Sequence, residues 1–268
     1  MGWRIYALIF VAGLITAVGT GIGTIPLFWA DDVNDRLDVG LWGLAGGLMA
    51  SASIFGLGYE MYRHPGDTWI GLVGVLGGVL LVVLAHNVIE RLDFDYDAHD
   101  IAEGDLQTVV SVFLVLLVHS FPEGLAIGVA FAHLPTSNTL AFWGFTIPLL
   151  AVVMTVTIAI HNMPEGVAIG VPLTGEEGVG NARMFGAAVF SSLPQPIGAV
   201  VAYYFLQFAQ QFLEFGYGFA AGAMLYLVVQ DIIPEGLEAG ESLERPKRVL
   251  AAGGILGFLG FAPLVFFL

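Results

Sequence analysis

The sequence predicts an all-helical polytopic membrane protein, and three observations carry that prediction. Hydrophobic residues make up 57% of the 268 positions and charged residues only 12%. The mean hydropathy is +0.85, and a soluble domain has about twice this charged fraction. The apolar residues also form long continuous runs, and a helix of about 20 such residues crosses a hydrocarbon core of about 30 Å.

We expect eight such runs to form the transmembrane helices of one domain that covers residues 1–268. Their ranges are 5–29, 39–60, 68–90, 107–132, 139–171, 183–206, 212–234 and 249–268. The first run could also be a signal peptide, but it continues past Pro26 to Trp29 without a convincing cleavage site. The chain contains no cysteine, which excludes disulfides and thiolate metal sites.

The eight basic residues lie unevenly among the connections between these runs. Two of them, Arg4 and Arg63, fall on one side of the membrane. The other six fall on the opposite side: Arg36, Arg91, Arg183, Arg245, Lys247 and Arg248. Because cytoplasmic connections carry the excess of Lys and Arg, we expect both termini outside the cytoplasm. The net charge is −15, and most acidic residues lie in the cytoplasmic connections. A surface adapted to high salt is the favoured interpretation of these acids, and collection of cations is the alternative.

One eleven-residue segment occurs twice in the chain. HSFPEGLAIGV at 119–129 returns as HNMPEGVAIGV at 161–171, and eight of the eleven positions are identical. His and Glu are four residues apart in each copy, so they share one face of a helix. The proline between them leaves a carbonyl of the preceding turn without its usual partner, which loosens the helix beside its ionisable groups.

These four side chains predict a divalent-metal site between the fourth and fifth helices: His119, Glu123, His161 and Glu165. Charged groups inside a membrane are costly, so function is the default interpretation and mere fastening of helices the alternative. The repetition favours a site, and two imidazoles with two carboxylates suit Zn²⁺. The two copies lie on consecutive spans and so run antiparallel, as inverted repeats around a midplane site require.

Further ionisable residues lie near the predicted cytoplasmic boundary. His86 and Glu90 end the third run, and His99 follows in an acidic connection. Asp231 and Glu235 have the same four-residue spacing near the end of the seventh run. A solvated helix end is the favoured interpretation of His86 and Glu90, with an exit site for an ion as the alternative. For Asp231 and Glu235 the two interpretations stand equal.

The duplicated motif resembles that of the ZIP (Zrt-, Irt-like protein) family of divalent-metal transporters, most closely its prokaryotic GufA-type branch. The two HxxPEG segments are the specific part of this resemblance. Supporting features are the acidic, His-bearing connection after the third run, the small-residue run around Met49 and the Pro194-Gln195-Pro196 segment. The resemblance covers nearly the whole chain.

The resemblance implies a binuclear centre, in which Met49 adds a ligand to the first site. The second site would share Glu123 and Glu165 and add Ser120, Asn162 and a residue of the sixth helix, here Gln195. The family often has Asn and Glu at the positions of Ser120 and Gln195, so the second site is expected to be weak. The family also implies movement of spans one, four, five and six against the other four, and a homodimer is one candidate assembly.

We therefore expect a transporter that moves Zn²⁺, or alternatively Fe²⁺, Mn²⁺ or Cd²⁺, across the cell membrane toward the cytoplasm. The metal would be the transported substrate, with no organic cofactor and no nucleic-acid partner. A membrane-embedded metallohydrolase is the alternative, because a bound Zn²⁺ can generate hydroxide. The nearly filled ligand set and the absence of a His-Glu-x-x-His motif argue against an enzyme. A proton or small-cation channel is a third class.

Overall fold

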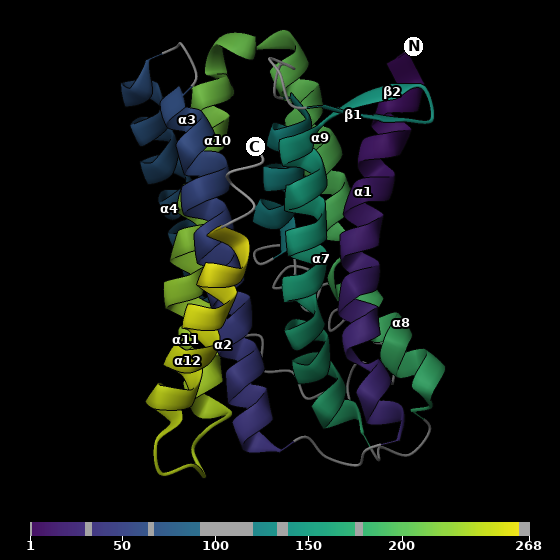
Figure 1. Ribbon diagram of the computed structural model, residues 1–268, viewed down its shortest axis with the longest axis vertical. Helices are drawn as coiled ribbons and strands as arrows, with labels where there is room; N and C mark the ends of the chain where they lie inside the picture. The colour runs from purple at the N-terminus through teal and green to yellow at the C-terminus, as the bar shows by residue number, and fades with distance from the viewer. Residues whose placement is uncertain are drawn as a thin grey trace.

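The computed structural model describes residues 2–29, 34–63, 67–91, 120–132, 139–174 and 179–262, and these are nearly all helical (Figure 1). The α-helices are α1 Gly2–Gly23, α2 Asp35–Ser51, α3 Tyr59–Arg63, α4 Thr68–Arg91, the helix Ser120–Ala132, α7 Leu149–Gly170, α8 Asn181–Ser191, α9 Pro194–Phe208, α10 Leu213–Leu227, α11 Ile233–Glu238 and α12 Pro246–Phe261. Short 3₁₀ turns are η1 Ile25–Phe28, η3 Val171–Leu173 and η4 Gln210–Phe212, and π-helical turns are η2 Ala52–Gly58 and η5 Val228–Ile232.

Within the described ranges, six helical stretches are long and apolar enough to cross a membrane. They are Trp3–Phe28, Asp35–Arg63, Thr68–Val88, Leu149–Val167, Asn181–Phe208 and Gln210–Glu238, and they match predicted spans one, two, three, five, six and seven. The helices in predicted spans four and eight, Ser120–Ala132 and α12, are shorter in the described ranges. Residues 107–119 and 263–268 lie outside those ranges. The polytopic helical class is confirmed, and the count of eight spans stays a prediction.

The fifth span begins later than the sequence suggested. Residues 139–148 were expected to start the helix, but they form an antiparallel hairpin of β1 Thr139–Phe142 and β2 Phe145–Pro148. Its two turn residues have positive φ, 48° at Trp143 and 79° at Gly144, which suits a two-residue hairpin turn. Pro148 then precedes the first turn of α7. The expected start at residue 139 was therefore wrong.

Four other predicted spans are not regular α-helices throughout their described ranges. The first ends in the 3₁₀ turn η1. The sixth breaks at Ser192 and Leu193, and α9 begins with Pro194, which has no N–H to lose in a first helical turn. The second and seventh each contain a π-helical turn, η2 and η5. By contrast, α7 continues through Pro164 to Gly170. The sequence signals these interruptions only where proline marks them.

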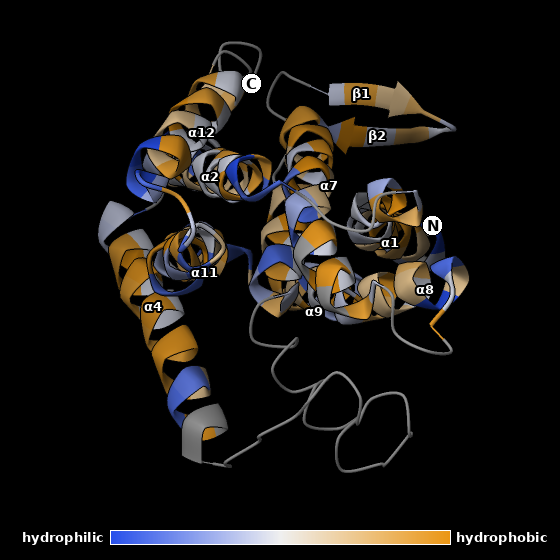
Figure 2. Ribbon diagram, turned by 90° about the horizontal axis from the view of Figure 1, so that it is seen from below, coloured by the Kyte–Doolittle hydropathy of each residue, from blue (hydrophilic) through white to orange (hydrophobic). Residues whose placement is uncertain are grey.

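The helices pack in two groups. In the first group, α2 packs on α12 and α4 packs on α10. In the second group, α1 packs on α7, α8 and α9. Contacts between α2 and α7 connect the two groups. Small residues allow the close approach, since a Cβ on Gly43 would lie 2.2 Å from the Leu250 carbonyl oxygen of α12. Figure 2 shows α4 as a largely hydrophobic helix at the edge of the bundle. On it Leu76 is 70% exposed, as expected for a side chain that faces lipid.

Candidate metal centre

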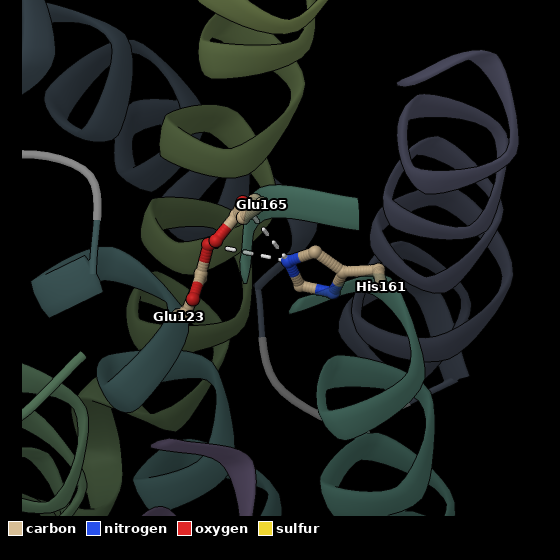
Figure 3. Close-up of side chains that lie close together, drawn as sticks. All are labelled: Glu123, His161 and Glu165. Atoms are coloured by element: carbon tan, nitrogen blue, oxygen red, sulfur yellow. Dashed lines mark hydrogen bonds and ion pairs between the residues drawn. The ribbon is translucent and has the colours of Figure 1, made fainter. Parts of the chain in front are cut away.

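Three side chains of the duplicated motif meet inside the protein (Figure 3). Nε2 of His161 lies 3.2 Å from Oε1 of Glu123 and 3.7 Å from Oε1 of Glu165. One possible ligand atom from each of the three residues lies within 4.8 Å of the others. Ligands about 2.1 Å from a tetrahedral Zn²⁺ are about 3.4 Å apart. The two contacts of His161 bracket that value, so one ion fits among these atoms with small adjustments.

The local fold explains why these side chains converge. His161 and Glu165 are four residues apart on α7, one turn of one face. Glu123 comes from the neighbouring Ser120–Ala132 helix. His161 is fully buried and Glu123 is 1% exposed, whereas the Glu165 side chain is 20% exposed. Glu165 therefore lies on the more accessible side of the centre.

Glycines of the motif bring other helix backbones close to this centre. A Cβ on Gly124 would lie 2.2 Å from the carbonyl oxygen of Gln195 in α9. A Cβ on Gly166 would lie 1.8 Å from the carbonyl oxygen of Thr20 in α1. No side chain fits at either position. Packing therefore requires glycine directly after each motif glutamate, just as the chemistry of the centre requires the glutamate.

Residues predicted for the second site form a hydrogen-bonded network beside Glu123. The Gln195 amide nitrogen donates to Oε2 of Glu123. Its carbonyl oxygen Oε1 accepts from Nδ2 of Asn162 at 3.1 Å and from the hydroxyl of Thr16. Nδ2 of Asn162 also donates to the backbone carbonyl of Thr16 at 3.0 Å. Ser120 instead donates to the Ser191 carbonyl at 3.2 Å.

Two further predicted ligands of the first site are Met49 and His119. Met49 is 1% exposed in α2, the helix that packs against α7. His119, the fourth ligand of the predicted first site, and His99 lie outside the described residues. The described part of the chain thus assembles three of the four predicted motif ligands.

Two of the predicted exit residues also meet. Nε2 of His86 on α4 lies 3.0 Å from Oδ1 of Asp231 in η5, and Nδ1 of His86 lies 3.0 Å from the Val82 carbonyl oxygen. Because a carbonyl only accepts, Nδ1 donates its proton to Val82. Glu235 is an exposed residue of α11, and Glu90 lies in the last turn of α4.

Sequence reasoning missed the contribution of α1 to this network. Thr16 and Thr20 are fully buried, and Thr20 shares a 2.6 Å hydrogen bond with Ser192 at the α8–α9 break. The available signal was the spacing of Thr16, Thr20 and Thr24 at intervals of four, which places three hydroxyls on one helix face.

The chain is a polytopic membrane protein with a candidate divalent-cation centre, in which buried His161 and Glu123 and partly exposed Glu165 converge among apolar helices of membrane length. The family model described as ZIP Zinc transporter matches residues 97–266. The chain therefore belongs to the ZIP zinc transporter family, whose members are transporters.

Individual relatives agree with this assignment. The zinc transporter GufA of Myxococcus xanthus is 30% identical over 239 residues, which cover 86% of this chain and 89% of GufA. The zinc transporter ZupT of Oceanobacillus iheyensis is 27% identical over 88% of this chain and 90% of its own length. A candidate zinc transporter of Arabidopsis thaliana is 32% identical over 90% of this chain, but the match spans only 36% of that protein. The GufA-type resemblance of the motifs is confirmed.

Proposed function

We propose that this protein carries Zn²⁺ across the cell membrane toward the cytoplasm, and that the ion binds at the centre of Glu123, His161 and Glu165. One observation carries the proposal: three ligand atoms of these residues lie within 4.8 Å of one another inside apolar helices. A neutral imidazole and two carboxylates together carry two negative charges, which match one divalent cation. In low dielectric, an uncompensated pair of carboxylates would be costly.

His119 and Met49 complete the ligand set in this proposal. His119 directly precedes the described Ser120–Ala132 helix, four residues before Glu123. Met49 would reach in from α2, the helix that packs on α7. A thioether is a soft ligand, so Met49 would favour Zn²⁺ and Cd²⁺ over Mn²⁺, while Fe²⁺ remains a further ion to test.

The basic residues support the direction of transport. With the eight predicted spans, six of the eight basic residues lie in connections on one side of the membrane. In this proposal that side is cytoplasmic and both termini lie outside. The proposed exit passes His86 and Asp231, whose side chains are 20% and 11% exposed near that side. The ion would then reach the acidic cytoplasmic connection that contains His99.

Flux of radiolabelled Zn²⁺ into proteoliposomes tests the proposal. The wild-type protein should transport Zn²⁺, and Glu123→Ala should nearly abolish transport. Glu238→Ala is the matched control, because Glu238 is an exposed carboxylate at the end of α11. Normal Zn²⁺ flux through the double variant Glu123→Ala/Glu165→Ala would refute the assignment of the centre.

A further inference from the structure

The amide of Gln195 is the centre of a polar network that joins four helices. Its side chain is fully buried at the start of α9. It contacts Thr16 of α1, Asn162 of α7 and Glu123 of the Ser120–Ala132 helix. Most buried polar groups are hydrogen-bonded, and these hydrogen bonds restrict the orientation of the Gln195 amide.

Chemistry decides which way the two amides face. Nδ2 of Asn162 lies 3.0 Å from the Thr16 carbonyl oxygen, which only accepts, so this atom must be the donor nitrogen. The Gln195 atom that faces Nδ2 of Asn162 must then be its oxygen. The Gln195 nitrogen is left to face Oε2 of Glu123, a carboxylate that accepts it. Turning the Gln195 amide over would set N–H against N–H and oxygen against oxygen.

In this orientation the two carboxylate oxygens of Glu123 have different partners. Oε1 faces His161 at 3.2 Å, toward the candidate ion. Oε2 accepts the N–H of Gln195. A carboxylate that bridges two ions must offer one oxygen to each, and here a hydrogen-bond donor stands where the second ion would bind Oε2.

We infer that Gln195 takes the place of a second cation, so that the centre holds one ion at a time. This inference rests on the proposed function. It makes Gln195 a positioning residue, because its amide orients Glu123 so that Oε1 faces the ion. Thr16 and Asn162 in turn fix the Gln195 amide. The partly positive N–H group balances the outer oxygen of Glu123 without adding a second divalent charge at the membrane interior.

The number of bound ions tests this inference. Detergent-purified protein is dialysed against micromolar Zn²⁺, and bound zinc is measured by elemental analysis. The wild-type protein should hold one ion per chain. Gln195→Glu supplies an acceptor in place of the donor and should raise the number toward two. The control Gln207→Glu changes an exposed glutamine of the same helix and should leave one ion bound.

A second variant separates positioning from folding. Gln195→Met keeps nearly the same side-chain volume and removes the hydrogen bonds, so Zn²⁺ affinity should fall about 10–100-fold, as for other partners of metal ligands. Size-exclusion chromatography shows whether Gln195→Met is folded. The number of ions bound by Gln195→Glu is a second readout that does not depend on the folding of Gln195→Met. Two ions bound to wild-type protein at micromolar zinc, with normal flux, would overturn this inference and leave the proposed function standing. Absence of both bound zinc and flux would overturn the proposed function itself.

Discussion

Replacement of Glu165 by Gln should remove most of the stabilisation that Zn²⁺ gives to the folded protein. The substitution keeps the side-chain shape and removes one of the three proposed ligands, whose Oε1 lies 3.7 Å from Nε2 of His161. Loss of a residue that only supports a metal ligand weakens affinity about 10–100-fold, so loss of a direct charged ligand should weaken it at least about 100-fold.

The magnitude follows from binding linkage. At a Zn²⁺ concentration 100 times the wild-type Kd, bound metal stabilises the wild-type protein by about 2.7 kcal/mol. A variant with a Kd about 100-fold higher is then half-saturated and gains only about 0.4 kcal/mol. Because the Glu165 side chain is 20% exposed, the uncharged amide can be accommodated without collapse of the fold.

Thermal unfolding in detergent, with and without Zn²⁺, measures this difference, and equilibrium dialysis measures the Kd. Glu238→Gln removes an exposed carboxylate of α11 and should keep the full Zn²⁺-dependent stabilisation. A Glu165→Gln variant whose Kd stays within about threefold of wild type would refute the view that Glu165 is a direct ligand.

Three further predictions concern protons, packing and release. Zn²⁺ binding should release protons and weaken on acidification, because a ligating imidazole must be neutral and the ligating carboxylates ionised. Calorimetry in buffers of different ionisation enthalpy measures the number of protons released. No proton release near pH 6 would contradict His ligation. Gly166→Leu should abolish transport, because its Cβ would meet the Thr20 carbonyl at 1.8 Å. Gly186→Leu should remain active, because a Cβ there meets no atom within 4 Å beyond its own stretch of helix. Asp231→Asn should slow Zn²⁺ flux at least about threefold, since it weakens the contact with His86. The Zn²⁺ affinity of the centre of Glu123, His161 and Glu165 should not change. Loss of that affinity would contradict the role of Asp231 in exit.

The convergence of Glu123, His161 and Glu165 was predictable because it depends on a local spacing within one helix and on a motif that occurs twice. Helical spacing places His161 and Glu165 on one face, and duplication of the motif indicates that the two copies act together. The hairpin at 139–148 was not predictable from apolar character, since a short apolar run fits a strand as well as a helix. Only the Trp143-Gly144 turn, with its positive φ values, distinguishes the two.

The network around Gln195 was out of reach for a different reason. Thr16 and Gln195 are 179 positions apart in the chain, and no local pattern pairs them. Threonine is also a common packing residue in membrane helices, so its presence in α1 has an ordinary explanation. The contact depends on how α1, α7 and α9 pack, which is a property of the assembled bundle.

That packing explains why the motif contains glycine beside each glutamate. Gly124 lets the α9 backbone approach the Ser120–Ala132 helix, and this approach brings Gln195 to Oε2 of Glu123. Gly166 lets α1 approach α7, which brings Thr16 to Asn162. In each copy the glutamate is a proposed ligand, and the following glycine admits the helix whose polar group contacts that glutamate or its neighbour. A larger residue at either glycine would therefore disturb metal binding through the positions of Gln195 and Asn162, even with every ligand intact.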